Sequence, residues 1–578
     1  MMIGAPALAR AVLAGLSLAS LARSAVLVDF QVQNPPPVPS GVKTCTVQLL
    51  EHTFGNSYYV PGVTNYTPPT GCGSPGTWTA VTLNLTVTSN GTQYDRLGVL
   101  TLQNVEIWRT STPEPTQAGI IWTYVKDVTK YIPLFAESGT FSFELNNIVT
   151  SSLNGQYAAT VTATFYESSA AHPAAGKSDL IIPIGRVTTS GGAEVSVPPS
   201  YSQNVTLPQN AVAVYAELYA SGNGDEEFWY FNTANDALSD LPSGYIGDGP
   251  FREVRLLVDG KLAGVAYPYA TIFTGGIVPT AWRPITSYGA LDLPTYFIDL
   301  TPFIPIIADG NSHNFTVDVA SAESDHVINS NWYLSANLQV VKDTSSKPTT
   351  GKINVYTAEP YGTANNDVVV GDNGDLTVTV TASRKVFVES TIKSGSGKTT
   401  IATWSQNLQY KNVQQFLNDT YVQIVTQTAS GTSIGTHNGI PVVSDAFSYP
   451  LTLNYDVLTE DGSAWYSSFD QSYDRVLEPT PFILSSTIKE RQLADGTFVI
   501  SSSGNYGNGT NNNTFSYIDG KGNTYFREVG AALNNITYDH VSGSLATGGW
   551  SWFEFPSFSP KAAATMKLAG ARVPKGKH

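Results

Sequence analysis

Charged residues and cysteines are scarce in this chain, and after the first residues no long apolar run occurs. Lys, Arg, Asp and Glu make up 13% of the 578 residues, and the formal net charge is −15. No basic stripe exists that could displace counterions from a phosphate backbone, so nucleic acid is excluded as a partner. An acidic surface is repelled by anionic lipids, and no later stretch reaches the length of an apolar membrane span. We therefore expect no membrane partner.

Metal-binding and nucleotide-binding patterns are also missing. The seven histidines are scattered and the two cysteines have no accompanying histidine pattern, so we expect no metal and no other cofactor. Residues 394–399 lack the first glycine of a phosphate loop. Gly431–Gly435 fits G-x-S-x-G, but no alternation of strands and helices surrounds it, as a nucleophile elbow requires.

The first 24 residues have the form of a secretory signal peptide. Arg10 precedes an apolar run, and Ala22-Arg-Ser24 offers small residues for cleavage. We expect a secreted protein, with extracellular, vacuolar and cell-wall destinations all compatible with this signal. Cys45 and Cys72 are expected to form a disulfide in that oxidising compartment. Nine N-x-S/T triplets fit passage through a glycosylating pathway, at Asn65, Asn84, Asn90, Asn204, Asn314, Asn418, Asn508, Asn512 and Asn535.

Short segments of alternating polarity dominate the chain and predict β-strands. Leu97–Leu102, Gly139–Leu145 and Tyr157–Tyr166 are clear cases, and no segment shows sustained helical periodicity. The 50 glycines and 34 prolines favour short strands joined by turns. This spacing is typical of a sandwich or jelly roll.

An internal repeat divides the chain. Asp127–Leu134 recurs as Asp299–Ile306 in the pattern D-[VL]-T-x-[YF]-I-P-[LI], with loosely similar flanks. We infer two copies of one all-β unit, and the length of the chain suggests a third domain. The fold class is therefore all-β, with two tandem jelly-roll or β-sandwich domains forming the catalytic unit and a third, C-terminal β-rich domain. We expect this third domain to be another sandwich that braces the first two, with residues 505–514 as a polar hairpin or mobile loop.

The expected organisation can be given by residue ranges. It comprises a signal peptide (1–24), a first sandwich carrying Asp95 (25–175), a second sandwich carrying an acidic loop (176–345), a C-terminal β-rich domain (346–560) and a flexible tail (561–578).

Potential site residues concentrate between Tyr94 and Phe135. Asp95 and Arg96 stand at the start of a predicted strand, and Glu106–Pro115 is expected to be an extended loop because its prolines forbid helix. Acid, base and aromatic side chains together suggest a site for a polar, ring-shaped ligand. The residues concerned, besides Asp95 and Arg96, are Trp108, Arg109, Glu114 and Trp122.

Two long loops of the second unit, Gly222–Gly249 and Tyr267–Ala290, are also expected to be functional. The first places Glu226 and Glu227 beside Trp229, and acids crowded against aromatic surface predict a raised carboxyl pKa. The second carries Arg283. A solvated acidic turn here, and a local ion pair at Asp95–Arg96, are the structural alternatives.

Several of these segments together resemble the secreted peptide-N-glycosidase A family. The resemblance rests on residues 104–116 (NVEIWRTSTPEPT), 119–123 (GIIWT), 224–230 (GDEEFWY), 251–254 (FREV) and 282–285 (WRPI), and it covers most of the mature chain. A fainter likeness reaches a bacterial glycoamidase built from two jelly rolls, in which a W-D-R tripeptide supplies the main catalytic aspartate. Tyr94-Asp95-Arg96 matches its D-R pair.

The resemblance implies a deglycosylating amidohydrolase that acts on N-glycopeptides and N-glycoproteins. It implies Asp95 as the main catalytic carboxylate and Glu144 as a further one. The resemblance also implies a catalytic carboxylate from the second unit, and Glu226, Glu227 and Asp248 are the candidates for it. We expect substrate binding by the remaining basic and aromatic side chains of the predicted site, Arg96, Trp108, Arg109, Trp122, Trp229 and Arg283. A non-catalytic carbohydrate-binding protein and a glycoside hydrolase are the alternative functions.

Overall fold

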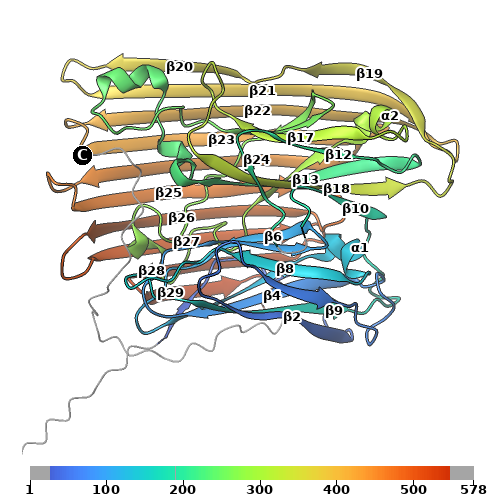
Figure 1. The fold of residues 1–578 in the computed structure, drawn as a ribbon, viewed down its shortest axis with the longest axis horizontal. Coiled ribbons are helices and arrows are strands. Elements are labelled where there is room, and N and C mark those ends of the chain that lie inside the picture. Colours follow the sequence, from blue (N-terminus) through green and yellow to red (C-terminus); the bar gives the residue numbers. More distant parts are fainter. Residues whose placement is uncertain (1–25, 189–190, 547–578) are drawn as a thin grey trace, which may run out of the picture.

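The structure, a computed structural model, describes residues 26–188 and 191–546. Its regular elements are almost all β-strands, in agreement with the predicted fold class (Figure 1). Within these residues no helix has the length and apolar character needed to cross a bilayer. The predicted signal peptide (1–24) and tail (561–578) lie outside the described residues.

The first unit is a jelly roll of two facing sheets. One sheet has the strand order β1-β7-β4-β9-β2 and the other the order β3-β8-β5-β6. Their inward-facing side chains form one apolar core, with Trp78, Leu100 and Phe143 fully buried. The strands are β1 (Leu27–Asp29), β2 (Thr44–Phe54), β3 (Gly62–Tyr66), β4 (Ala80–Ser89), β5 (Leu97–Leu102), β6 (Val105–Ser111), β7 (Ile120–Asp127), β8 (Gly139–Leu145) and β9 (Tyr157–Tyr166).

The second unit repeats this strand order, without a counterpart of β1. Its sheets are β10-β18-β13-β16, with β11 also paired to β18, and β12-β17-β14-β15. The Asp259-Gly260 turn between β14 and β15 has positive φ at both residues, as an Asp-Gly hairpin favours. The strands are β10 (Leu180–Ile184), β11 (Val195–Val197), β12 (Tyr201–Val205), β13 (Ala211–Asn223), β14 (Glu253–Val258), β15 (Lys261–Ala266), β16 (Thr295–Asp299), β17 (His313–Ala320) and β18 (Asn331–Lys342).

The repeated octapeptide forms the same local structure in both rolls, which supports the predicted duplication. In each copy the aspartate ends a strand, and its carboxylate accepts a hydrogen bond from the backbone N–H two residues later, at 2.9 Å for Asp127 and 2.9 Å for Asp299. A short helical segment follows each aspartate. These segments are η1 (Thr129–Tyr131) with α1 (Ile132–Phe135), and η6 (Thr301–Phe303) with α2 (Ile304–Ile307).

The C-terminal part is a single eleven-stranded antiparallel sheet, so the prediction of a third sandwich is wrong. Its strands alternate between buried and exposed residues, and the buried face shares one hydrophobic core with the second roll. In Figure 1 this wide sheet extends along both rolls. Period-two alternation predicts strands, but it does not tell which layer covers their apolar face.

Residues 506–514 belong to the paired strand β27, so the predicted hairpin or mobile loop at 505–514 is also wrong. Inward-facing asparagines make the segment look loop-like although it is hydrogen-bonded on both sides. The strands of the sheet are β19 (Thr350–Ala358), β20 (Thr363–Val370), β21 (Leu376–Lys393), β22 (Thr399–Leu417), β23 (Val422–His437), β24 (Ile440–Val457), β25 (Ala464–Leu477), β26 (Ser486–Val499), β27 (Tyr506–Asp519), β28 (Thr524–Ala532) and β29 (Asn535–Ser542).

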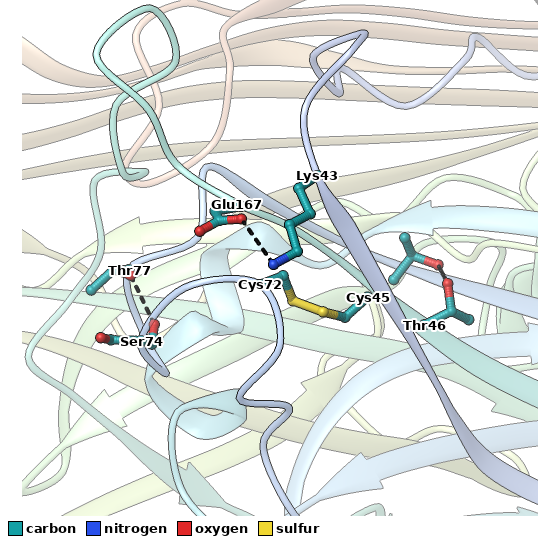
Figure 2. Close-up of a disulfide and its surroundings, with 8 residues drawn as sticks. Lys43, Cys45, Thr46, Cys72, Ser74, Thr77 and Glu167 are labelled. Carbon is teal, nitrogen blue, oxygen red and sulfur yellow. Dashed lines mark hydrogen bonds and ion pairs between the residues drawn. A yellow bond between two sulfur atoms is a disulfide. The ribbon is translucent and has the colours of Figure 1, made fainter.

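Cys45 and Cys72 form the predicted disulfide, with 5.8 Å between their Cα atoms. Figure 2 shows it joining β2 to the loop before β4, beside the ion pair of Lys43 with Glu167. Closing a loop of this length stabilises a fold by about 3 kcal/mol. Seven of the nine predicted glycosylation asparagines are exposed, and Asn84 and Asn314 are half-buried, so none lies in the core.

Candidate active site

A cavity of about 120 Å³ is lined by residues of both jelly rolls. Four carboxylates converge on it, and amide, hydroxyl and guanidinium groups complete the polar lining. The carboxylates are Asp95, Glu144, Glu194 and Glu227, and the other polar side chains include Tyr58, Arg96, Ser111, Asn146, Asn223 and Tyr333. Asp95 and the Gly222–Gly249 segment therefore line the same cavity, as expected.

Topologically equivalent loops of the two rolls build this region. Asp95 lies in the β4–β5 connection of the first roll, and Glu227 lies in the corresponding β13–β14 connection of the second. Glu114 lies between β6 and β7, and Gly275 lies in the corresponding connection between β15 and β16. The duplication therefore supplies two matched loops from each side.

Asp95 is buried and lies beside a second carboxylate. A Cβ atom on Gly275 would come within 2.5 Å of Oδ1 of Asp95 and 2.6 Å of Oε1 of Glu114, so both oxygens face the same glycine. Arg283 is 3.6 Å from the other oxygen of Glu114. Burial raises the pKa of the neighbouring Asp29 to about 7, although Arg283 acts to lower it. Two carboxylates, Glu114 and Asp29, thus interact with the guanidinium of Arg283, and one of them, Glu114, lies beside Asp95.

Glu144 lies near the end of β8, and both of its carboxylate oxygens accept hydrogen bonds. Oε1 accepts a hydrogen bond from the Asn146 side chain at 2.9 Å. Oε2 accepts one from the Gly192 backbone at 2.6 Å and one from Arg186 at 3.2 Å. The carboxylate that the family resemblance pointed to therefore lines the cavity, and it anchors a segment of the second roll to the first.

Glu194, which sequence reasoning missed, comes from that segment. Its side chain is 9% exposed, and Oε1 is 3.4 Å from Arg186. Burial, followed by the charges of Glu144 and Glu106, raises the pKa of Glu194 to about 7. It stands in a plain Gly-Gly-Ala-Glu-Val stretch. No sequence pattern marked it, because its environment comes from strands of the other roll.

Glu226 and Glu227 have different surroundings, which separates these two candidates. Glu226 is fully buried and forms a two-pronged ion pair with Arg252, at 2.5 and 2.6 Å, and it also accepts a hydrogen bond from Trp332 at 2.7 Å. Although burial acts to raise it, Arg252 holds the pKa of Glu226 below its usual value. The predicted raised pKa is therefore wrong for Glu226, which has a structural role. Glu227 is the residue that lines the cavity.

Asp248, the third candidate, lies apart from the cavity lining. Its carboxylate accepts a hydrogen bond from the Asn235 side chain at 3.2 Å, and its own carbonyl accepts one from Arg252. It occupies a turn with φ of 60°. Asp248 shapes this loop and does not line the cavity.

The three tryptophans predicted to bind sugar are buried in the cores. Trp108, Trp122 and Trp229 are 0%, 1% and 4% exposed. Trp108 donates a hydrogen bond to the Leu291 carbonyl at 3.0 Å. These rings offer no free face to a sugar, so the prediction of stacking is wrong. Aromatic residues in β-rich sequences mark a core as readily as a binding surface.

The predicted extended loop Glu106–Pro115 is largely strand β6, buried along its whole length. Arg109 pairs with Glu106 at 2.7 Å and donates to the Tyr333 carbonyl of the second roll at 2.6 Å. Arg109 therefore docks the two rolls instead of binding substrate. A strand covered on both faces lacks the alternation by which it could be recognised.

Ion pairs also join the two rolls, among them Lys130 with Glu217 at 2.5 Å and Lys126 with Asp292 at 2.6 Å. Although burial acts to raise it, Lys130 holds the pKa of Glu217 below its usual value. These pairs fix the relative position of the rolls, and with it the distance between the carboxylates that each roll contributes.

The two predicted basic groups of the site differ in position. Arg96 lines the cavity, where its guanidinium donates to Gln93 at 2.7 Å and to Asn147 at 3.2 Å. Arg283 is 3% exposed and lies against Glu114, outside the cavity lining. The predicted direct contact of Arg283 with substrate is therefore not supported, whereas Arg96 has the position it requires.

Amide side chains of the C-terminal sheet hold the loops of the second roll. Gln492 donates to the Thr286 carbonyl at 3.0 Å and accepts from the Tyr288 backbone at 3.0 Å. Gln414 donates to the Asn232 carbonyl at 2.9 Å. These amides replace water as partners of loop backbone that lacks a strand neighbour. The short helical segments of these loops are η2 (Gly224–Glu226), η3 (Trp229–Phe231), η4 (Asn235–Asp240) and η5 (Pro279–Trp282).

Comparison with known proteins identifies relatives over nearly the whole chain. Residues 34–359 match the family model described as peptide N-acetyl-beta-D-glucosaminyl asparaginase amidase A, and residues 377–451 match the model of the PNGase A C-terminal domain. The chain is 32% identical over 572 residues to peptide-N4-(N-acetyl-beta-glucosaminyl)asparagine amidase A of Prunus dulcis. That alignment covers 94% of this chain and 98% of the relative.

Two solved structures are similar at a lower level. PNGase F, a glycosylasparaginase from Flavobacterium meningosepticum, is 15% identical with a TM-score of 0.35 over 52% of this chain and 97% of its own. PNGF-II is 12% identical with a TM-score of 0.34 over 52% of this chain and 66% of its own. On the family models and the near-full-length relative, this chain belongs to the peptide N-acetyl-beta-D-glucosaminyl asparaginase amidase A family.

Proposed function

We propose that this protein hydrolyses the β-aspartyl-glucosaminyl amide bond of N-glycopeptides and N-glycoproteins. The asparagine becomes aspartate, and the glycan leaves as a glycosylamine. The near-full-length relation to an amidase A carries this proposal. Carboxylates that converge from two sides would also suit a glycoside hydrolase, so the cavity alone does not select the amide bond.

The cavity offers the groups that amide hydrolysis needs. The Asp95 carboxylate accepts a proton from the attacking water as its oxygen bonds to the amide carbon. Arg96 stabilises the negative charge that develops on the carbonyl oxygen, an effect of about 3 kcal/mol for one well-placed donor. Glu227, from the second roll, binds the sugar next to the scissile bond.

Tyrosines at the cavity take the role first expected of the tryptophans. Tyr58 lines the cavity, and its ring meets that of Tyr59 edge to face at 4.8 Å. They are 46% and 65% exposed. The Tyr59 N–H donates to Asn146 at 2.7 Å, which orients this pair beside the carboxylates. Their ring faces stack on the apolar face of a sugar of the glycan core.

The decisive experiment treats a defined N-glycopeptide with the wild type and with Asp95→Asn. Mass spectrometry should find aspartate at the former glycosylation site with the wild type, and a rate at least about 100-fold lower with the variant. Turnover near the wild-type rate would remove Asp95 from the mechanism. One sugar left on asparagine would indicate a glycoside hydrolase, and no product at all a binding protein.

Single exchanges of Glu226, Glu227 and Tyr58 complete the test of the site. Glu227→Gln should impair turnover of folded protein more than Glu226→Gln does. Tyr58→Ala should raise KM for the glycopeptide, whereas Tyr506→Ala, which removes a ring of 49% exposure in the C-terminal sheet, should not. Equal KM values for both tyrosine variants would refute sugar stacking at Tyr58.

Secretion is part of the same proposal. The disulfide between Cys45 and Cys72 and the solvent-facing sequon asparagines support passage through an oxidising, glycosylating compartment. Expression in a eukaryotic secretory host should yield medium-localised protein whose mass falls after enzymatic removal of glycans. Retention inside the cell with no glycans would refute it.

A further inference from the structure

The proposed amide hydrolysis also requires a proton donor for the leaving nitrogen. An amide nitrogen departs as a neutral amine only if it gains a proton while the carbon–nitrogen bond breaks. Asp95 is assigned to the water, and both oxygens of Glu144 already accept hydrogen bonds, one of them from the Gly192 backbone at 2.6 Å. A carboxyl at the cavity is required in which one oxygen is not occupied by a protein donor.

Glu194 meets this requirement in position. It lines the same cavity as Asp95, and its Oε2 atom is buried without a hydrogen-bond partner. Oε1 faces Arg186 at the long distance of 3.4 Å. Because a neutral carboxyl carries one O–H group, an oxygen that no protein donor occupies is the natural place for the proton.

The surroundings of Glu194 are predominantly acidic. Glu144 from β8 and Glu106 from β6 both act to raise its pKa, whereas Arg109 from β6 and the half-exposed Arg186 oppose them. Arg109 is already engaged by Glu106 at 2.7 Å. The tyrosine that faces Glu194 from β18 is Tyr333, whose own pKa is raised by burial and then by nearby charges. The balance brings the pKa of Glu194 to about 7, so that a substantial fraction of this carboxyl carries a proton at neutral pH.

We propose that Glu194 is a further catalytic residue, the carboxyl that gives its proton to the leaving nitrogen of the scissile amide. This proposal rests on the proposed function. Water forms a bond to the carbonyl carbon and gives a proton to Asp95, and the carbon–nitrogen bond breaks as the nitrogen takes the proton of Glu194. The products are aspartate in the peptide and a glycosylamine. Exchange with solvent returns the proton from Asp95 to Glu194.

The first test is the pH profile of Glu194→Gln. In the wild type, kcat/KM should fall as pH rises through about 7, because the donor loses its proton. In the variant, kcat should be about 100- to 10,000-fold lower, as for loss of a general acid, and the decline near neutral pH should be absent. Turnover within threefold of the wild type, or a slow variant that keeps the same alkaline decline, would overturn the proposal.

Gly192→Ala provides a second route to the same residue without changing the carboxyl. A Cβ atom at Gly192 would lie 1.9 Å from Oε2 of Glu194, so the side chain must rotate away from its place. We expect a loss of kcat similar in direction to that of Glu194→Gln. The matched control Glu137→Gln alters an exposed glutamate outside the cavity lining and should leave kcat unchanged.

Titration separates failure of this proposal from failure of the proposed function. Infrared difference spectra of wild type against Glu194→Gln report protonation of this carboxyl without any turnover. A carboxyl that titrates near pH 7 supports the assignment, whereas one that titrates in the ordinary glutamate range overturns it. If no glycopeptide is deamidated by the wild type, the amidase proposal fails irrespective of this titration.

Discussion

Gly275→Ala should disable the site while leaving the fold intact. The added Cβ would lie 2.5 Å from Oδ1 of Asp95 and 2.6 Å from Oε1 of Glu114, whereas ordinary contacts begin near 3.4 Å. Each oxygen must therefore retreat by about 1 Å, and a misplacement of that size costs about 100-fold in rate. The loop itself cannot withdraw easily, because Thr274 donates to the Thr112 carbonyl of the first roll at 2.9 Å.

The stability effect of this substitution should be small. Overpacking of a buried site costs about 1–3 kcal/mol, and the reduced freedom of the unfolded chain returns about 0.4–1 kcal/mol. The backbone at Gly275 does not have positive φ, so alanine is not strained there. The thermal midpoint should consequently fall by only a few degrees.

The assay is kcat on a defined N-glycopeptide, with the thermal midpoint measured on the same preparation. Gly176→Ala is the control, because a Cβ there meets nothing within 4 Å. A Gly275→Ala enzyme that is folded and retains kcat within threefold of the wild type would refute the placement of Asp95 against this loop. Loss of the folded state would refute the estimate of its stability.

Three further predictions concern stability, pH and the supporting sheet. Glu226→Gln leaves the Arg252 charge buried without its partner, so the free energy of unfolding in urea should fall by about 3–5 kcal/mol; an unchanged midpoint would contradict the structural role. Two aspartates raise the pKa of His313 in the folded protein. The stabilisation that the protonated His313 contributes is therefore fully present below the unfolded pKa of about 6.5, and it is lost as the pH rises through the higher folded pKa. His313→Gln should therefore lower the thermal midpoint at pH 5 more than at pH 9, and an equal loss at both would exclude the effect. Gln492→Leu removes the two hydrogen bonds to the loop that carries Gly275, so hydrogen exchange of that loop should quicken and kcat should fall; unchanged exchange would show that the sheet does not hold the loop.

The local elements of the fold were largely predictable from the sequence. β9 runs from Tyr157 to Tyr166, as the alternation of side chains predicts, and the duplicated octapeptide adopts one geometry in both rolls. Both depend on interactions between residues close in the chain. The site was predictable in part, since Asp95 and Glu227 do face one cavity. The roles of Trp108 and Arg109 were not, because the second roll covers β6 and turns an apparent loop into an interior strand.

By itself, the sequence determined most of the strands, the Asp-Gly turn and the duplication, because alternation, turn chemistry and repeated motifs are local properties of the chain. It also determined the disulfide, because the chain has only two cysteines. Only the tertiary structure decided which carboxylates lie together at one cavity. Glu226 and Glu227 are neighbours in sequence, yet one is neutralised by Arg252 and the other lines the cavity. Burial, followed by the charges of Glu144 and Glu106 of the first roll, raises the pKa of Glu194. Burial and the charges of distant residues set the pKa of a carboxyl, and these follow from the packing of one roll against the other.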